Sequence, residues 1–316
     1  MALLLFLTAG AAAQTQTKAR IGVLLPELGR AQSQSLKGLN DELKRLGFIE
    51  RKNLVVETRN AKGDRSALRP AAEDLVARKV EAIFTTGTRA TIAAIGATGV
   101  IPIVFVHPGD PAAAGMVKSI GQPPRNLTGI AGFAVDKTEQ RLALLKELIP
   151  ELREVHIFFD SNNNFSRDHF ALAQAAARKL GLPVVEHGVK SADELKTTLS
   201  SMRFAPGAAL FHVPDDLVEG EAEFIFTSAR QKKLPSMFNE ESWAIRGATA
   251  AYGPSYLAMG QRAGTIVGRI LKNSKAALPA IERAEKFDYV VNYRTANFMG
   301  LKIAPSVLKK ADKVIR

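Results

Sequence analysis

The sequence contains no cysteine, and this absence removes several classes of protein at once. A disulfide framework, a thiolate metal site and a cysteine nucleophile are all excluded. The five histidines include no pair at metal-ligand spacing, so the sequence predicts neither a metal site nor a cofactor. We therefore expect each histidine to lie on the surface or in a loop.

The usual catalytic and nucleotide-binding motifs are missing as well. No serine stands in a G-x-S-x-G elbow, no G-x-x-x-x-G-K-[ST] sequence occurs, and no G-x-G-x-x-G sequence follows an apolar run. The acidic pairs 215–216 and 240–241 are adjacent in sequence, so in an extended chain their side chains point apart rather than forming an acid–base dyad. The sequence therefore predicts no catalytic residue and favours a protein that is not an enzyme.

No apolar stretch is long enough to span a bilayer. The apolar run at residues 2–7 is short and leads into small residues at 11–13, a pattern typical of a secretory signal with its cleavage site. We expect residues 1–19 to be a signal peptide with a disordered N-terminus, and the mature protein to be soluble and periplasmic. No cysteine follows the small residues, so no lipid anchor is indicated.

The chain is basic, with a net charge of +12 and a pI near 9.9. Such a balance invites a nucleic-acid hypothesis. However, the basic residues are spread through amphipathic segments such as 37–45 and 230–233, and no basic run is interleaved with aromatic residues. We interpret these residues as solvated helix faces and expect no nucleic-acid partner.

What the chain does have is a regular alternation of strand and helix patterns. Short apolar runs at 21–25, 54–56, 82–84 and 103–106 predict buried strands, and residues at helical spacing follow them. After Pro150 the alternation restarts with strands expected at 155–159, 184–185, 208–213, 237–238, 248–252 and 287–291. Two such series predict an α/β protein with parallel, doubly wound sheets, whose two lobes face each other across a cleft.

The alternation alone leaves the later boundaries open, because the helix expected at 257–271 and the strand expected at 287–291 could belong to either lobe. Within the lobes we expect Thr88 to cap a helix, a small-residue helix to begin directly after residues 107–111, and one helix to run through 219–231. We also expect Ser166 to cap the helix that carries Phe170.

In open α/β sheets the carboxyl ends of the strands are where ligands bind. The side chains expected at these ends are polar and give the predicted ligand-binding residues: Glu27, Thr86, Gly87, Thr88, Arg89, His107, Gly109, Asp110, Asn162, Asn163, Asn164, Asp215, Glu240 and Tyr252. Helix N-termini follow several of them and suit a carboxylate.

Each of these residues also has a structural interpretation. Thr88 is a common helix cap, and Arg89 in a first helical turn usually extends into water. The asparagines at 162–164 could offer amides to a ligand or simply form the turn before a helix. Asp215 could hold an amino or hydroxyl group or merely initiate its helix, and Trp243 fits core or hinge packing as well as a stacking platform.

Several segments resemble the ABC-transporter substrate-binding family, whose known members include tryptophan-binding lipoproteins. They are "NAKGD", "TRATIAA", "IPIVFVHPGDPAAAGMV", "PPRNLTGI", "ATAAYGPSYLAMGQRAG" and "ADKVIR", so the resemblance runs from about residue 21 to the end. It implies a type I periplasmic-binding-protein fold, in which two Rossmann-like lobes are joined by three hinge crossings and hold a small ligand between them. With three crossings we place lobe 1 at residues 20–131 plus about 254–284, and lobe 2 at 132–253 plus about 285–316. The resemblance also implies delivery to an inner-membrane permease driven by a cytoplasmic ATPase, and we expect a monomer.

The resemblance also bears on the ligand. The turn at residues 107–111 resembles the family's Gly-Asp-Pro turn at the cleft edge, and its two prolines make it stiff, which lowers the ordering cost of capture. The family commonly has Thr-Pro-small where this chain has Thr88-Arg89-Ala90, and the added cation favours an acidic or polar ligand.

The sequence therefore predicts a periplasmic solute-binding protein of an ABC importer. Its ligand is expected to be small and polar or carboxylate-bearing, either amino-acid-like or aromatic. One alternative is an exported α/β enzyme, a hydrolase or racemase that uses Asp215 and Glu240, and the other is a periplasmic sensor module. Conversion of the ligand would favour the enzyme.

Overall fold

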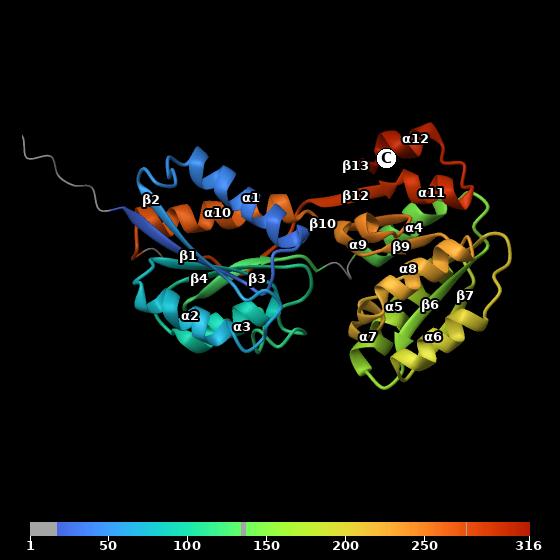
Figure 1. The fold of residues 1–316 in the computed structure, drawn as a ribbon, viewed down its shortest axis with the longest axis horizontal. Helices are drawn as coiled ribbons and strands as arrows, with labels where there is room; N and C mark the ends of the chain where they lie inside the picture. Colours follow the sequence, from blue (N-terminus) through green and yellow to red (C-terminus); the bar gives the residue numbers. More distant parts are fainter. Residues whose placement is uncertain (1–17, 134–136, 276) are drawn as a thin grey trace, which may run out of the picture.

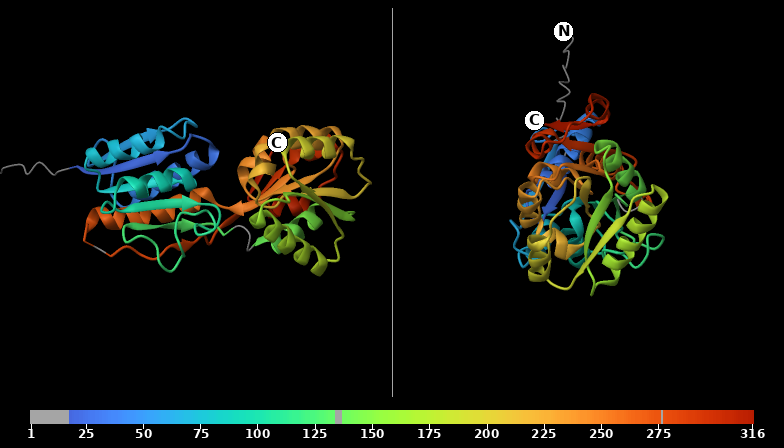
Figure 2. Two further views of the ribbon diagram at one scale, coloured as in Figure 1. Left: turned by 90° about the horizontal axis from the view of Figure 1, so that it is seen from below. Right: turned by 90° about the vertical axis from the view of Figure 1, so that its right-hand side faces the viewer.

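The computed structural model describes residues 18–133, 137–275 and 277–316, which form two lobes along the long axis of the molecule (Figures 1 and 2). Each lobe is a largely parallel sheet covered by helices, which confirms the predicted α/β class. The segment expected to be a signal peptide lies almost entirely outside the described residues. No helix within the described ranges is both long and apolar enough to cross a membrane.

Lobe 1 contains a six-stranded sheet in the order β11-β5-β4-β3-β1-β2, and all of its strand pairs are parallel. Its strands are β1 (Ala19–Leu25), β2 (Leu54–Asn60), β3 (Ala82–Thr86), β4 (Ile103–His107), β5 (Leu127–Ala131) and β11 (Glu282–Arg283). Its helices are α1 (Arg30–Arg45), α2 (Leu68–Ala77), α3 (Gly87–Ala97) and α10 (Tyr256–Lys272).

Apolar residues on both sides of each strand explain why helices cover both faces of this sheet. In β1 the alternate residues Ile21, Val23 and Leu25 pack into the core beneath α1 and α10, whereas Leu24 packs into the core beneath α2 and α3. Figure 1 shows these two helix pairs on opposite sides of the sheet. A sheet buried on both faces leaves its strand ends as the places where polar side chains can meet a ligand.

Lobe 2 contains a seven-stranded sheet in the order β13-β12-β10-β9-β8-β6-β7. Its strands are β6 (Glu154–Asp160), β7 (Val184–Val189), β8 (Ala208–Phe211), β9 (Ser236–Phe238), β10 (Ala250–Pro254), β12 (Phe287–Asn292) and β13 (Lys313–Ile315). Its helices are α4 (Thr138–Leu148), α5 (Asn164–Lys179), α6 (Ala192–Ser201), α7 (Asp216–Gly220), α8 (Ala222–Gln231), α9 (Glu241–Arg246), α11 (Tyr293–Met299) and α12 (Pro305–Lys310).

The chain crosses between the lobes three times, after β5, between β10 and α10, and between β11 and β12. The last two crossings run in opposite directions, so β10 and β12 pair antiparallel, with Pro254 opposite Phe287. The Ser255 N–H donates to the Lys286 carbonyl oxygen at 2.9 Å and extends this pairing into the hinge. The expectation that the sheets are parallel is therefore wrong at this one pair, because one strand leaves lobe 2 where the other enters it.

Four local predictions are wrong. Residues 111–115 form turns rather than a helix, because Gly115 takes a φ of +70°. The helix expected at 219–231 is divided into α7 and α8 at Glu221. Helix α3 begins at Gly87, so its cap is Thr86 rather than Thr88, and the cap of α5 is Asn163 rather than Ser166.

The expectation for the histidines is wrong at two positions. His156 and His169 are buried within a strand and a helix, whereas His212 is buried but lies in a loop. His156 lies within β6 and stacks on His187 with ring centroids 5.2 Å apart, and its Nδ1 is 2.9 Å from the His187 Nε2. A neutral imidazole can enter a core when another polar group satisfies its nitrogen atoms, which a search for metal-ligand spacing does not consider.

Candidate functional site

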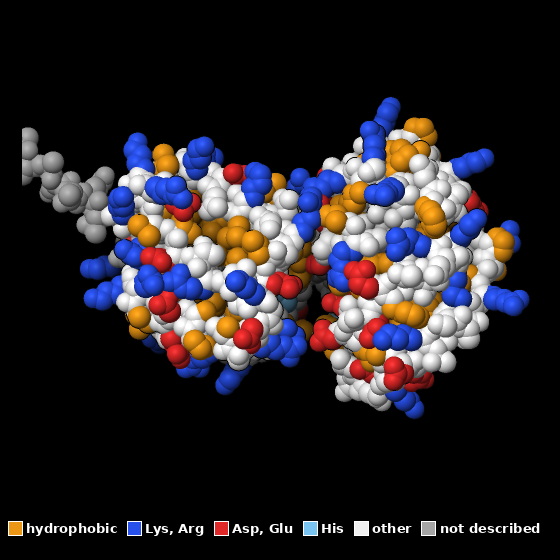
Figure 3. Space-filling view, in the orientation of Figure 1, with side chains coloured by type: hydrophobic (Ala, Val, Ile, Leu, Met, Phe, Trp, Pro, Cys, Tyr) orange, Lys and Arg blue, Asp and Glu red, His pale blue; other side chains and the backbone are white. Residues whose placement is uncertain are grey.

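Figure 3 shows a hollow between the two lobes. Residues that follow the carboxyl ends of strands in the two lobes meet at this junction, because Arg30, after β1, donates to Glu241, after β9. On the lobe 1 side, β3 ends at Thr86 and β4 at His107. On the lobe 2 side, His212 directly follows β8 and Asn239 directly follows β9. Both pairs of strands are hydrogen-bonded neighbours, so each lobe brings two polar side chains together at its strand ends.

These four side chains share an unusual property. Eight buried side-chain polar atoms have no hydrogen-bond partner in the described part of the chain, and four of them are Thr86 Oγ1, His107 Nδ1, His212 Nδ1 and Asn239 Oδ1. Burying a polar atom without a partner costs about 1–3 kcal/mol. Such atoms in a native fold call for an explanation, and a ligand that completes their hydrogen bonds provides one.

On the lobe 1 side, Thr86 leads into the N-terminus of α3. Thr86 is only 4% exposed, and its hydroxyl makes no capping hydrogen bond. The first turn of α3 contains no acidic residue, Thr88 is half-buried, and Arg89 is exposed. A helix N-terminus that lacks an acidic side chain keeps its partial positive charge available to an anion.

The turn after β4 is fixed to the hinge. The Gly132 N–H donates to the His107 carbonyl oxygen at 2.7 Å, and the Phe133 N–H donates to the Gly109 carbonyl oxygen at 3.4 Å. The Asp110 carboxylate accepts from the Ala112 N–H at 2.7 Å and stabilises the turn. Burial lowers the pKa of His107 to about 4, so the imidazole is neutral at neutral pH.

On the lobe 2 side, His212 lies within a buried polar network. Its Nε2 is 3.2 Å from Glu219 Oε1, and Arg141 Nη2 donates to its carbonyl oxygen at 2.6 Å. Burial, together with the neighbouring guanidinium, lowers the pKa of His212 to about 3. Burial and the nearby carboxylates of Asp216 and Asp215 raise the pKa of Glu219 to about 7. The ring is therefore neutral, and when Glu219 is ionised the ring donates through Nε2 and leaves Nδ1 as an acceptor.

Arg141 is a buried cation without a carboxylate partner in the described residues. It is 2% exposed, its guanidinium lies 4.4 Å from the centre of the Phe211 ring, and its Nε atom has no hydrogen-bond partner. Burial lowers its pKa to about 9. Its hydrogen bond to the His212 carbonyl oxygen supports the loop that carries His212.

Several predicted ligand-binding residues are engaged within their own lobe. Asp215 caps α7 by accepting from the Val218 N–H at 2.9 Å, and it also accepts from the Asp160 N–H at 2.6 Å. Asn163 caps α5, and Asn164 accepts from Arg167. Asn162 is exposed, and its N–H donates to Asp160 Oδ1 at 2.8 Å. These residues shape the loops at the strand ends, and ligand contact by any of them stays a prediction.

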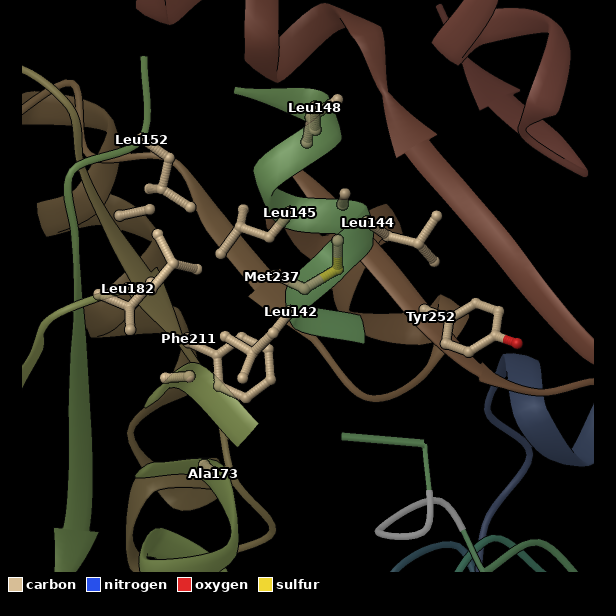
Figure 4. Close-up of a cluster of buried hydrophobic side chains, with 14 of the residues drawn as sticks. Leu142, Leu144, Leu145, Leu148, Leu152, Ala173, Leu182, Phe211, Met237 and Tyr252 are labelled. Atoms are coloured by element: carbon tan, nitrogen blue, oxygen red, sulfur yellow. The ribbon is translucent and has the colours of Figure 1, made fainter. Parts of the chain in front are cut away.

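Three further predicted residues occupy different surroundings. Glu27 is exposed in the loop after β1, and the Gly87 φ of +74° makes the turn from β3 into α3. Tyr252 lies within β10 rather than in a loop, and its ring is 5.7 Å from that of Phe287. Figure 4 shows its hydroxyl pointing away from the leucines of α4.

Glu240 is placed differently again. Its carboxylate accepts from the Ser242 hydroxyl and from the Tyr256 hydroxyl, each at 2.5 Å. Tyr256 is the first residue of α10, so this hydrogen bond joins the two lobes. The contribution of Glu240 to the site is therefore a link between lobes, and direct ligand contact stays a prediction.

Sequence reasoning missed His212, Asn239, Arg141 and Glu219. The strand at 208–213 was expected to end at Val213, but β8 ends at Phe211. His212 was therefore placed inside the strand rather than at its end. Asn239 stands directly after an apolar run, and that position was a usable signal. Within the described ranges, no group of three histidine, aspartate or glutamate side chains is arranged to hold a metal ion.

Similarity to known proteins covers almost the whole chain. The sequence profile of the family described as ABC transporter substrate binding protein matches residues 20–315. The chain belongs to this family. A tyrosine-binding protein of Clostridioides difficile (strain R20291) is 25% identical over 279 residues, which are 88% of this chain and 78% of the relative.

Solved structures of other proteins have the same fold. One is a ligand-free, open substrate binding protein with adhesive properties from Clostridium difficile, with a TM-score of 0.76 and 24% identity over 94% of this chain and 99% of that one. Another is an ABC domain from Streptococcus pneumonia in complex with L-Trp, with a TM-score of 0.74 and 24% sequence identity. The match covers 95% of this chain and 100% of that structure's chain. These structures confirm the predicted type I periplasmic-binding-protein fold.

Membership of the family also confirms the predicted class of function. The chain is a solute-binding protein of the ABC transporter type, and its partners are a small molecule and a transporter. The family consists of binding proteins rather than enzymes, and proteins of this kind work in the periplasm or outside the cell. Neither the exported enzyme nor the sensor module gains support from these relatives.

Proposed function

We propose that this chain is the periplasmic receptor of an ABC importer and captures an aromatic or similar amino acid between its lobes. The observation that carries the proposal is the set of four unpartnered buried atoms at facing strand ends, two from each lobe. A ligand that completes hydrogen bonds on both sides stabilises a closed arrangement of the lobes more than an open one. The proposed receptor works as a monomer and passes its ligand to a permease driven by a cytoplasmic ATPase.

The two sides of the cleft differ in polarity. Lobe 1 offers the N-terminus of α3, the Thr86 hydroxyl and the Arg89 guanidinium, which suit a carboxylate. Lobe 2 offers acceptors, namely Asn239 Oδ1 and, when Glu219 is ionised, His212 Nδ1. A primary ammonium group has three donors and no acceptor, so it matches the lobe 2 side. The proposed orientation therefore places the ligand carboxylate on lobe 1 and its ammonium on lobe 2.

One exposed aromatic side chain near the end of β6 supports the ligand class. Phe165, in the first turn of α5, is 42% exposed and packs on His169 with ring centroids 4.0 Å apart. Exposed aromatic rings at a cleft offer a face to the ring of a ligand. The relatives that bind tyrosine and L-Trp point in the same direction.

Calorimetric titration with a matched panel tests this proposal. Tyrosine, tryptophan and phenylalanine are compared with tyramine, tryptamine and phenethylamine, which lack the carboxylate, and with the corresponding arylpropionates, which lack the ammonium. We expect the amino acids to bind, and loss of either charged group to weaken binding about tenfold or more. Equal affinity for amino acid and arylpropionate would contradict the lobe 2 assignment, and equal affinity for amino acid and amine would contradict the lobe 1 assignment.

A further inference from the structure

Two adjacent acidic residues at the start of α9 reach across to lobe 1. Glu240 accepts a hydrogen bond from the hydroxyl of Tyr256, the first residue of α10. Glu241 accepts from Arg30, the first residue of α1, through Nε at 3.1 Å and Nη2 at 2.9 Å. Figure 1 shows α1 and α9 at the junction of the lobes.

The surroundings of Glu241 hold its carboxylate in place. Its side chain is 10% exposed and also accepts from Lys313 Nζ at 2.8 Å. Lys313 in β13 in turn lies 3.3 Å from Asp288, which belongs to β12. A carboxylate that is fixed by a second cation loses less side-chain entropy when it pairs with Arg30 than a free surface carboxylate would.

Both links lie beside the hinge rather than across the mouth of the cleft. Tyr256 follows the crossing at Pro254 and Ser255, and Asp288 follows the crossing that leads into β12. Atoms close to a hinge axis move little when the lobes close, so these contacts can persist in both arrangements.

We propose that Glu240, Glu241, Tyr256 and Arg30 form an interlobe clasp that restricts the lobe orientations of the unliganded protein and thereby raises the affinity for every ligand of the cleft. The effect on affinity rests on the proposed function. Restriction before binding reduces the conformational entropy lost on closure. The four residues are positioning residues.

Tyr256→Phe and Arg30→Gln test the clasp, with Tyr289→Phe and Lys37→Gln as matched controls. Tyr289 has a buried hydroxyl without a partner among the described residues, and Lys37 forms an exposed ion pair with Asp41 inside lobe 1. We expect each clasp variant to weaken binding of all amino acids in the panel by the same factor, about two- to twelvefold. Small-angle scattering of the unliganded clasp variants should show a larger radius of gyration and a broader distribution of interatomic distances than the wild type. The control variants should change neither the affinity nor the scattering.

The outcomes separate the clasp from the ligand site. A clasp variant that changes the relative affinities within the panel would show that the residue contacts the ligand, and this would overturn the proposal. Unchanged affinity in both clasp variants would overturn it as well. If the wild-type protein binds no member of the panel, the proposed function fails, whereas scattering of the unliganded variants still decides whether the clasp restricts the lobes.

Discussion

The contribution of Thr86 to stability does not explain why its hydroxyl group is buried. Its hydroxyl is buried at the end of β3 and has no hydrogen-bond partner in the part of the chain that the structure describes. We expect Thr86→Val, which replaces the hydroxyl by a methyl group, to raise the melting temperature of the unliganded protein and to stabilise it by up to about 1 kcal/mol. The same change should weaken amino-acid binding about tenfold, because the ligand loses a partner. Thermal unfolding and calorimetry measure the two effects.

Thr91→Val is the matched control, since the Thr91 hydroxyl is engaged. It donates to the Gly87 carbonyl oxygen and lies 2.8 Å from Thr85 Oγ1. This variant should lower the melting temperature. A Thr86→Val protein that is destabilised like the control, with unchanged affinity, would show that the hydroxyl serves the fold rather than a ligand.

A second prediction concerns the pH dependence of ligand affinity and follows from Glu219. Its pKa is raised to about 7, and its ionised form leaves His212 Nδ1 as an acceptor for the ligand ammonium. Affinity for an amino acid should therefore rise as the pH increases from about 6 to about 8, while the ligand stays zwitterionic. The pKa values of His107 and His212, at about 4 and 3, lie below this range. Glu219→Gln should remove the slope, and a slope that persists in this variant would assign the titration to another group.

Residue-scale features of the site were only partly predictable. Position after an apolar run identified Thr86 and His107, because strand ends follow from the apolar pattern. The apolar pattern could not show that both carboxylate oxygens of Asp215 accept hydrogen bonds from backbone N–H groups. It also could not show that Arg30 meets Glu241, because that contact depends on how two lobes far apart in sequence are set against each other.

The contact between α1 and α10 gives a prediction at the scale of elements. An added Cβ at Gly260 would lie 2.1 Å from the Ser35 carbonyl oxygen, so the helices approach through a position with no side chain. Alanine normally favours a helix over glycine by about 1 kcal/mol. Here we expect the cost of overpacking to exceed this gain in helix propensity. Gly260→Ala should therefore destabilise lobe 1 by about 1–3 kcal/mol, measured by denaturant unfolding.

Gly96→Ala in α3 is the matched helical control. An added Cβ there meets only the guanidinium of Arg69, the far end of a flexible side chain. This variant should be neutral or more stable than the wild type. If Gly260→Ala behaves in the same way, the close approach of α1 and α10 is not required for the fold.

Elements were predicted best where one period dominates the sequence. The strands β1, β3 and β4 and the long helices α1 and α10 follow directly from apolar runs and helical spacing. Short elements depended on single backbone positions, such as Gly115, whose left-handed φ prevents the expected helix after Pro111. The antiparallel pairing of β10 with β12 was not predictable, because it follows from the paths of two hinge crossings.

At the scale of the whole molecule, the absence of cysteine makes lobe closure measurable. Introduced cysteines can be labelled without competition, since the chain has none of its own. Ile92 of α3 is 45% exposed, and an added Cβ at Gly220 of α7 meets no atom within 4 Å. These helices lie on opposite sides of the hollow between the lobes (Figures 1 and 3). The predicted lobe boundaries, at about residues 131, 253 and 284, place the two labels in different lobes.

We expect the distance between labels in Ile92→Cys/Gly220→Cys to decrease when a saturating amino acid is added, because contacts from both strand edges stabilise the closed arrangement. Spin-label distance measurement or energy transfer between dyes gives the readout. A pair within lobe 2, Lys190→Cys/Gly220→Cys, should keep its distance. If calorimetry shows that ligand is bound and the interlobe distance does not change, the ligand contacts only one lobe, and the unpartnered atoms of the other lobe need a different explanation.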